Sequence, residues 1–327
     1  MSASGRPRVL LMHPILDPGP AILAEAAEVL PYPSTEPLDE QSIRQAAEGC
    51  VGIVSHLKDP IGSIVLSTPG LRCVSNVAVG FDNIDVKTAT ANRVWVTNTP
   101  GVLDDATADF AFALLMAAAR RIVEADLFTR QGHYKGWEID MMLGADVHDA
   151  TLGIIGIGRI GRGVARRAKG FNMRVLYSDT NPLLPDVEQQ LGATHVELPR
   201  LLAESDFISV HVPLTKETQH LLSAPQFAQM KRGAIIINTS RGPVVDEAAL
   251  VEALKSHRIA GAGLDVYERE PAIHPGLVGL HNVVLAPHIA SATTRTRSEM
   301  SAMAARNMAT AARGGRPPNV LNPELKR

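Results

Sequence analysis

The sequence predicts an α/β fold with two doubly wound parallel sheets. Two observations carry this prediction. Short β-branched apolar runs alternate with longer amphipathic stretches, which is typical of βαβ units around a parallel sheet, and the alternation restarts at Thr151. The 327 residues also suffice for two domains of about 150 residues each. We therefore expect two Rossmann-like domains with a cleft between them.

The first series predicts strands at residues 8–13, 51–55, 72–76 and 94–98, and then a helix from Asp104, a capping residue, to about Thr129. The second series predicts strands at residues 151–156, 174–178, 207–212, 234–238, 261–265 and 283–286. An Ala- and Met-rich helix is expected over about 291–313, with Met300, Met303 and Met308 in core or subunit packing. We expect residues 1–101 plus 291–327 to form one domain and residues 102–290 the other.

The composition excludes several classes of protein. With 32 basic and 34 acidic residues, the formal net charge is −2, which disfavours a nucleic-acid or anionic-membrane surface. The basic residues Arg162, Arg166, Arg167 and Lys169 have no interleaved aromatic residues, so we expect them to form a solvated helix face.

The cysteines and the N-terminal apolar run bear on cellular location, and the histidines bear on metal binding. Cys50 and Cys73 indicate buried thiols in a reducing compartment, and the apolar run at residues 9–12 is too short for a signal peptide or membrane span. We therefore expect a cytoplasmic protein. None of the eleven histidines has metal-ligand spacing such as HExxH, so no metal site is expected.

A dinucleotide site is predicted at Gly156, Gly158 and Gly161, which form a GxGxxG motif between a strand and a helix. The first glycine allows the tight turn, the second lets the backbone approach a pyrophosphate, and the third lets helix and strand close up. Asp179, at the end of the next strand, can accept hydrogen bonds from ribose hydroxyls and repel a 2′-phosphate, which favours NAD. Arg159 can pair with phosphate, so NADP remains possible.

Three ionisable residues follow successive predicted strands of the second series, namely Arg241, Glu270 and His288. In an open parallel sheet, ligands bind outside the carboxyl ends of the strands, so these groups should converge near the dinucleotide. Each residue taken alone could be a loop or surface residue. Together, beside a dinucleotide motif, they predict an active site.

The sequence resembles the D-isomer-specific 2-hydroxyacid dehydrogenase family over nearly its whole length, closest to the glyoxylate/hydroxypyruvate reductase branch. Besides the motifs above, the resemblance rests on three segments: Val77-Ala-Val-Gly-Phe-Asp-Asn-Ile-Asp85, Asn98-Thr-Pro-Gly-Val-Leu-Asp-Asp-Ala-Thr-Ala-Asp109 and His211-Val-Pro-Leu-Thr215. It implies NAD(P)H-dependent reduction of a small 2-oxo acid, glyoxylate or hydroxypyruvate, to the D-2-hydroxy acid. It also implies a homodimer.

The resemblance implies a catalytic set of Arg241, Glu270 and His288. His288 would donate the proton, Glu270 would orient its ring, and Arg241 would bind the substrate carboxylate. Substrate contacts are implied for Leu57, Val79, Gly80, Trp137, Arg241 and His288. Cofactor contacts are implied for Thr107, Gly156, Gly158, Arg159, Ile160, Gly161, Asp179, Val212, Pro213, Thr239, Ser240, Asp265 and Ala290.

Structural interpretations remain open for three of these residues. Gly80 could serve only a turn, Trp137 could be a packing anchor, and Thr107 could cap the helix that begins near it. Other functions also remain open. Within the family they are 2-ketogluconate reduction, phosphoglycerate oxidation, and formate or phosphite oxidation. Outside it, a dinucleotide-sensing protein like the transcriptional co-repressors is the alternative.

Overall fold

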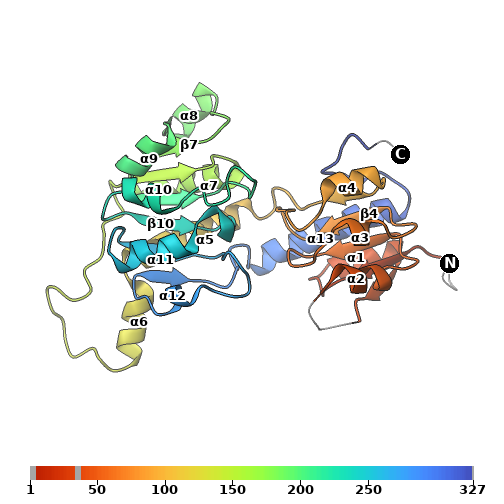
Figure 1. Ribbon diagram of the computed structural model, residues 1–327, viewed down its shortest axis with the longest axis horizontal. Coiled ribbons are helices and arrows are strands. Elements are labelled where there is room, and N and C mark those ends of the chain that lie inside the picture. Colours follow the sequence, from red (N-terminus) through yellow and green to blue (C-terminus); the bar gives the residue numbers. More distant parts are fainter. Residues whose placement is uncertain (1–4, 34–37, 326–327) are drawn as a thin grey trace. The chain divides into compact units, whose positions relative to one another are not determined.

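The computed structural model describes residues 5–33 and 38–325, and the chain divides into two compact units (Figure 1). Unit 1 consists of Met1–Leu103 and Ala292–Arg327, and unit 2 of Asp104–Ser291. The chain therefore passes from one unit to the other twice. Each unit contains one parallel sheet with helices on both faces, which confirms the predicted α/β class.

The sheet of unit 1 has five parallel strands in the order β2-β1-β3-β4-β5. The strands are β1 (Arg8–Leu11), β2 (Glu28–Pro31), β3 (Gly52–Ser55), β4 (Cys73–Asn76) and β5 (Trp95–Thr97). The helices are α1 (Gly19–Ala26), α2 (Glu40–Ala46), α3 (Ser63–Leu66), α4 (Val86–Ala91) and α13 (Thr294–Ala312). The edge strand β2 was not predicted, because its sequence lacks the continuous apolar run of a central strand and none of its residues is fully buried.

Helix α13, drawn in blue in Figure 1, closes one face of this sheet together with α1. Met308 is fully buried there, and a Cβ on Gly52 of β3 would lie 2.2 Å from its sulfur, so the helix packs tightly on the strand. Met300 is also buried, which confirms the core packing expected for two of the three methionines. Cys50 and Cys73 are both buried thiols, as the sequence predicted.

The sheet of unit 2 has seven parallel strands in the order β12-β11-β10-β9-β6-β7-β8. They are β6 (Thr151–Ile155), β7 (Arg174–Ser178), β8 (Ala193–His195), β9 (Phe207–Val210), β10 (Ile235–Asn238), β11 (Gly261–Leu264) and β12 (Val283–Leu285). The three-residue edge strand β8 was not predicted. The strand order reverses between β6 and β9, the point at which open α/β sheets bind their ligands.

Helices cover both faces of the second sheet. They are α5 (Asp104–Ala119), α6 (Ile122–Arg130), α7 (Arg159–Ala168), α8 (Pro185–Leu191), α9 (Leu198–Glu204), α10 (Ala224–Gln229), α11 (Glu247–Lys255) and α12 (Pro275–Val278), with the 3-10 turns η1 (Lys169–Phe171) and η2 (Gly242–Val244). The basic face of α7 pairs partly with α5, since Arg166 lies 3.1 Å from Asp105 and Arg167 2.6 Å from Asp109. Within the described ranges, no helix is long and apolar enough to cross a bilayer.

The single helix predicted over residues 104–129 is wrong, because the chain breaks between α5 and α6. Arg121 adopts a left-handed φ of 53° at the break. The carbonyl of Ala119, the last residue of α5, accepts a hydrogen bond from the amide of Ala145 at 2.8 Å. A Cβ on Gly144 would lie 2.3 Å from the same carbonyl oxygen, so only glycine fits there. A segment some 25 residues downstream thus ends the helix, and local periodicity could not reveal that.

Candidate active site and cofactor site

The three predicted catalytic residues follow three neighbouring strands of unit 2. Arg241 follows β10, Glu270 follows β11 and His288 follows β12, and these strands lie side by side in the sheet. The Nδ1 atom of His288 is 2.8 Å from Oε2 of Glu270. The sheet order therefore brings together residues that are 47 positions apart in the sequence.

His288 sits in a turn that the buried Asp265 holds in place. The φ of His288 is 54°, a left-handed value that is unusual for a non-glycine residue. The two carboxylate oxygens of Asp265 accept hydrogen bonds from the backbone amides that follow His288, those of Ile289 at 2.7 Å and Ala290 at 2.8 Å. Asp265 is fully buried, and burial raises the pKa of its carboxyl. Its carboxylate thus fixes the conformation of the loop that carries His288.

The loop that carries Glu270 is fixed by Tyr267. The amide of Tyr267 donates to Oε1 of Glu270 at 3.1 Å, and its hydroxyl donates to the carbonyl of Ala286 at 2.9 Å, just before His288. Burial alone would raise the pKa of Glu270, but the hydrogen bond and charge of His288 outweigh it, so the pKa is lowered. Glu270 is thereby held as a carboxylate against the His288 ring.

Arg241 lies in a loop that packs directly on the Glu270 loop. A Cβ on Gly242 would lie 1.9 Å from the carbonyl carbon of Tyr267, so the backbones touch and position 242 admits only glycine. Asn238 Nδ2 donates to the carbonyl of Arg241 at 2.9 Å, and Arg241 Nη1 donates to the carbonyl of Ser240 at 2.9 Å. The guanidinium is near enough to Glu270 for its charge to help lower that pKa.

The GxGxxG motif links β6 to α7, as predicted. Gly156 has a φ of +91°, and a Cβ there would lie 2.9 Å from the backbone of His211; a Cβ on Gly161 would lie 2.2 Å from the Gly156 oxygen. Gly158, by contrast, has open space where its Cβ would be, with no other atom within 4 Å. The first and third glycines thus serve packing, and the second leaves the backbone open at the start of α7. This is the arrangement that a dinucleotide pyrophosphate requires, so the residues present fit the cofactor.

Asp179 is bonded to the same loop. Its Oδ2 accepts from the amide of Ile157 at 2.8 Å, and its Oδ1 accepts from the amide of Asn181 at 2.8 Å. Each carboxylate oxygen has a second lone pair, so these bonds orient the carboxylate and leave it able to accept ribose hydroxyls.

The remaining predicted cofactor residues differ in exposure. Thr107 is buried on α5, and the buried Oγ1 of Thr239 has no hydrogen-bond partner within the part of the chain described. The others are half-buried or exposed, except Ala290, which is buried: Arg159, Ile160, Val212, Pro213, Ser240 and Ala290. The orphaned hydroxyl of Thr239, between β10 and Arg241, is a polar group that a ligand could satisfy.

In unit 1, the predicted substrate residues also follow the carboxyl ends of strands. Leu57 follows β3, and Val79 and Gly80 follow β4, the neighbouring strand. Apart from Thr107 on α5 and Trp137 in the loop after α6, the predicted ligand residues of each unit lie at the carboxyl end of its own sheet.

Sequence reasoning missed a histidine pair beside Leu57. The fully buried Asp59 accepts from His13, whose Nε2 lies 2.6 Å from Oδ1, and from the backbone amide of His56 at 2.7 Å. Burial and the neighbouring His13 lower the pKa of His56 to about 4, so its ring is neutral at pH 7. These residues follow β1 and β3, neighbours in the sheet but distant in sequence, so no local spacing marks them.

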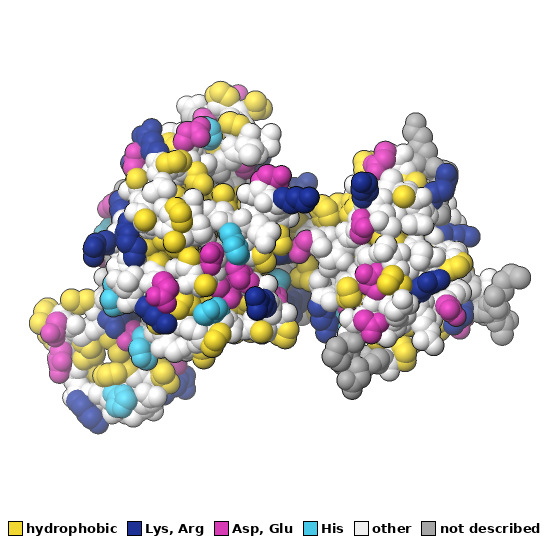
Figure 2. Space-filling model, viewed as in Figure 1, with side chains coloured by type: hydrophobic (Ala, Val, Ile, Leu, Met, Phe, Trp, Pro, Cys, Tyr) yellow, Lys and Arg dark blue, Asp and Glu magenta, His cyan; other side chains and the backbone are white. Residues whose placement is uncertain are grey.

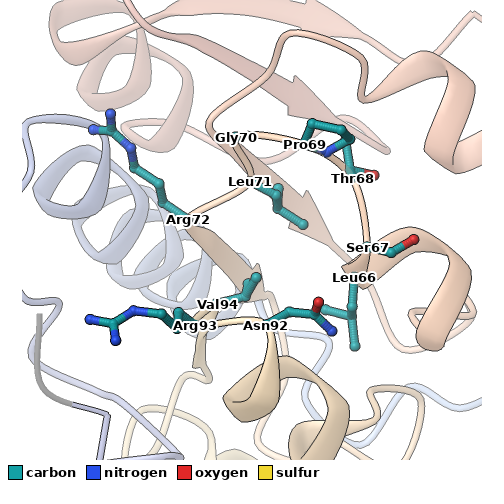
Figure 3. A pocket seen from close by; sticks show the side chains of 10 residues that line it. All are labelled: Leu66, Ser67, Thr68, Pro69, Gly70, Leu71, Arg72, Asn92, Arg93 and Val94. Atoms are coloured by element: carbon teal, nitrogen blue, oxygen red, sulfur yellow. The ribbon is translucent and has the colours of Figure 1, made fainter.

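A pocket of unit 1 with a volume of about 370 Å³ lies at the amino ends of the strands, opposite the end that carries the predicted substrate residues (Figure 3). Its lining includes Arg72 just before β4 and Val94 just before β5, so it opens at the amino ends of these strands. The predicted substrate residues lie beyond the carboxyl ends. This pocket is therefore separate from the candidate site. Among residues 5–33 and 38–325, no group of three or more His, Cys, Asp or Glu could hold a metal ion.

Trp137 lies in the loop after α6, which stands away from the sheet of unit 2 (Figure 1). Its side chain is 77% exposed, and α6 itself has no buried residue. Six further large apolar side chains on α6 and this loop are exposed: Ile122, Val123, Leu127, Tyr134, Ile139 and Leu143. Hydrophobic side chains are visible on this projecting segment at the lower left of Figure 2. Within the chain itself, Trp137 is not a packing anchor.

Comparison with known proteins agrees with this geometry. Residues 112–290 match the family model described as D-isomer specific 2-hydroxyacid dehydrogenase, NAD binding domain. A glyoxylate reductase of Korarchaeum cryptofilum is 52% identical over 324 residues, which is 98% of this chain and 97% of the relative. Two solved structures, each 32% identical, are similar over nearly the whole chain. A glyoxylate reductase from Paecilomyes thermophila has a TM-score of 0.88 and covers 98% of this chain and 100% of its own. An NADPH-dependent glyoxylate/hydroxypyruvate reductase from Sinorhizobium meliloti, solved with NADP and malonate, has a TM-score of 0.86 and covers 97% of each chain.

The chain therefore belongs to the D-isomer specific 2-hydroxyacid dehydrogenase family. It is an NAD(P)-dependent oxidoreductase that acts on CH–OH groups. Within the family it falls in the glyoxylate reductase branch, since relatives of that name match it over nearly its full length.

Proposed function

We propose that this enzyme reduces glyoxylate or hydroxypyruvate to the corresponding 2-hydroxy acid, giving the D-isomer where the product is chiral. The observation that carries the proposal is the His288–Glu270 pair, with Nδ1 and Oε2 2.8 Å apart, beside Arg241. The names of the relatives support the choice of substrate. The substrate needs both an acidic group for a cation to bind and a carbonyl to protonate, as 2-oxo acids have.

In the proposed mechanism, the residues of unit 2 carry out the proton chemistry. Because Nδ1 of His288 is engaged by Glu270, its Nε2 is the nitrogen that can donate a proton to the carbonyl oxygen. The Glu270 carboxylate orients the ring and stabilises the imidazolium. Arg241 offers a planar pair of N–H donors to the carboxylate of the substrate. The nicotinamide, when bound, supplies the hydride. In unit 1, Leu57 and the amides of Val79 and Gly80 are assigned to substrate binding.

We further propose the cofactor contacts. The amides at the start of α7, around Gly158, would hold the pyrophosphate, and Asp179 would bind the adenosine ribose of NAD. The open space at Gly158 supports the first assignment, and the orientation of Asp179 by Ile157 and Asn181 supports the second. The S. meliloti neighbour was solved with NADP, so NADPH is included in the test as a second cofactor.

We propose a homodimer in which α6 and the loop after it are covered by a second copy. The seven exposed apolar side chains of this segment support the proposal, because such patches on soluble proteins mark interaction sites. Trp137, 77% exposed, would then reach the substrate site of the partner. Light scattering of the wild type and of Leu127→Glu tests the assembly. The wild type is expected to be a dimer and the variant a monomer, and a monomeric wild type would overturn the proposal.

We also propose a cytoplasmic location, which the buried thiols Cys50 and Cys73 support.

The first experiment is a substrate panel. NADH and NADPH oxidation is followed with glyoxylate, hydroxypyruvate, 2-ketogluconate and pyruvate, and kcat/KM is compared; oxidation of phosphoglycerate with NAD is measured alongside. The highest kcat/KM is expected for glyoxylate or hydroxypyruvate. Preference for another acid would overturn the substrate, and tight NADH binding without turnover of any acid would shift the function to dinucleotide sensing.

A further inference from the structure

Tyr267 lies where the three loops of the candidate active site meet. Its backbone amide donates to Oε1 of Glu270 at 3.1 Å, and its hydroxyl donates to the carbonyl of Ala286 at 2.9 Å, two residues before His288. A Cβ on Gly242 would lie 1.9 Å from the carbonyl carbon of Tyr267, so the loop after β10 touches this residue as well. One residue therefore contacts all three loops.

These contacts join into a closed ring around the proposed proton-donating pair. Glu270 accepts from the Tyr267 amide with Oε1 and pairs with Nδ1 of His288 through Oε2, at 2.8 Å. From His288 the chain runs back through Pro287 to Ala286, whose carbonyl accepts from the Tyr267 hydroxyl. Both members of the pair are thus tied to the same residue, and the hydroxyl makes the bond that closes the ring.

The backbone of His288 needs support from its surroundings. Its φ of 54° lies in the left-handed region, and a non-glycine residue stays there only where neighbouring contacts hold it. Asp265 bonds the two amides that follow His288, and the Tyr267 hydroxyl bonds the carbonyl two residues before it. The segment after β11, which also carries Glu270, therefore holds the histidine on both sides.

The hydroxyl distinguishes Tyr267 from a residue that serves packing alone. The side chain is 5% exposed and lies in the core of unit 2, where the ring of a phenylalanine would fill the same space. A buried hydroxyl is costly without a partner, and the partner here is the carbonyl of Ala286. Burial also raises the pKa of Tyr267 to about 12, so the hydroxyl keeps its proton and donates throughout the pH range of an enzyme assay.

We propose, as an extension that rests on the function proposed above, that Tyr267 is a positioning residue whose amide and hydroxyl together align Nδ1 of His288 on the Glu270 carboxylate. Tyr267 acts through this pair and is assigned no contact with substrate or cofactor. An aligned carboxylate stabilises the imidazolium that donates the proton. Loss of the hydroxyl should therefore slow the protonation of the carbonyl group and leave the binding of the 2-oxo acid almost unchanged.

Tyr267→Phe tests this, because it removes the hydroxyl and keeps the ring. The matched control is Tyr177→Phe. Tyr177 is a fully buried tyrosine of the same unit, and its hydroxyl donates to Glu188 and accepts from the amide of Leu183 at 2.8 Å, both outside the three loops. The control loses at least as many buried hydrogen bonds, so a loss of stability alone would affect it at least as much.

For Y267F we expect the single-turnover rate of NADH oxidation by the preferred 2-oxo acid, at saturating acid, to fall about 3- to 10-fold. The Ki of oxamate, an unreactive analogue, should stay within about twofold of the wild type. Y177F should change neither value by more than about twofold. A wild-type rate in Y267F, or equal losses of rate in the two variants, would overturn the proposal. A wild type that turns over no 2-oxo acid would instead overturn the proposed function.

The pH profile separates positioning from a merely structural role. Reduction needs protonated His288, so the rate falls as the pH rises. A poorly aligned Glu270 stabilises the imidazolium less, so this fall should begin about 0.5 pH units lower in Y267F than in the wild type. The variant leaves unchanged the other charged groups near this junction, which are Asp265, Arg241 and Glu247. An unshifted profile in Y267F would contradict the proposed alignment.

A measurement on the wild type keeps the proposal testable if Y267F does not fold. With tyrosine labelled with ¹³C at Cζ, a hydroxyl that exchanges slowly with solvent gives two signals in an equal mixture of H2O and D2O. Tyr267 should give two signals, whereas the exposed Tyr134 should give one. A single averaged signal from Tyr267 would show that its hydroxyl is not held, and the proposal would be wrong.

Discussion

At the carboxyl end of its sheet, unit 2 carries charged side chains after β10, β11 and β12, whereas the loop after β4 of unit 1 is held by neutral side chains. His288, Glu270 and Arg241 interact through ionic hydrogen bonds and charge. In unit 1, Asn76 and Asn98 hold carbonyl groups without adding charge. Under the proposed function, the residues of unit 2 exchange a proton and need tuned charges, whereas the loop of unit 1 binds a carboxylate and needs a fixed conformation.

The largest effect is expected from His288→Ala in unit 2. Loss of the proton donor should lower kcat by about 10²–10⁴-fold, while NADH binding is retained. Stopped-flow and steady-state rates measure this. The matched control is His220→Ala, since His220 also pairs with a glutamate of unit 2, with its Nε2 2.6 Å from Oε1 of Glu268. Similar losses in the two variants would show that any His–Glu pair of this unit matters only for folding.

Arg241→Lys should have the next largest effect. Lysine keeps the charge but cannot offer two parallel N–H donors, so kcat/KM should fall about 10- to 100-fold, corresponding to about 1.4–2.7 kcal/mol. Arg200→Lys, which changes an exposed partner of Glu204, serves as the control. An R241K enzyme with wild-type kcat/KM would show that the amides of unit 1 alone bind the carboxylate.

Asp179→Ser should reduce the preference for NADH over NADPH about tenfold, because the repulsion of a 2′-phosphate is removed. The ratio of kcat/KM values for the two cofactors is the measurement. Asp186→Ser, which alters an exposed acid of α8, should leave that ratio alone. An unchanged ratio in D179S would contradict the assignment of Asp179 to the ribose.

The smallest effect concerns stability in acid. Folding lowers the pKa of Glu270 below its ordinary value of 4.5, so its stabilising contribution is present above that value and is lost as the pH falls through the lowered pKa. Glu270→Gln should remove this dependence. As the pH is lowered from about 5, the melting temperature should fall less steeply in E270Q than in the wild type. Melting temperatures that fall in parallel with pH would show that folding does not lower the pKa of Glu270.

The residues of unit 2 could be predicted because their chemistry marks them. A histidine, a glutamate and an arginine after successive strands stand out, and each glycine of the GxGxxG motif has a known structural role. Asn76 and Asn98 do not stand out, since asparagine is common in any turn and the bond from Asn98 to Val79 spans 19 residues. The break after Ala119 depends on Ala145 and was missed for the same reason: the contact that causes it is not local.

The discontinuity of unit 1 has a consequence for synthesis. Its sheet is complete once β5 has been made, but α13, which buries Val9, Val54 and Cys73 and bonds to Asn98 through Asn307, comes after the whole of unit 2. On the ribosome, unit 2 can close its core while this face of the unit 1 sheet is covered by α1 without α13. A nascent chain would thus fold its proposed dinucleotide-binding unit before α13 packs on unit 1. It could then bind the cofactor before it can catalyse the reaction.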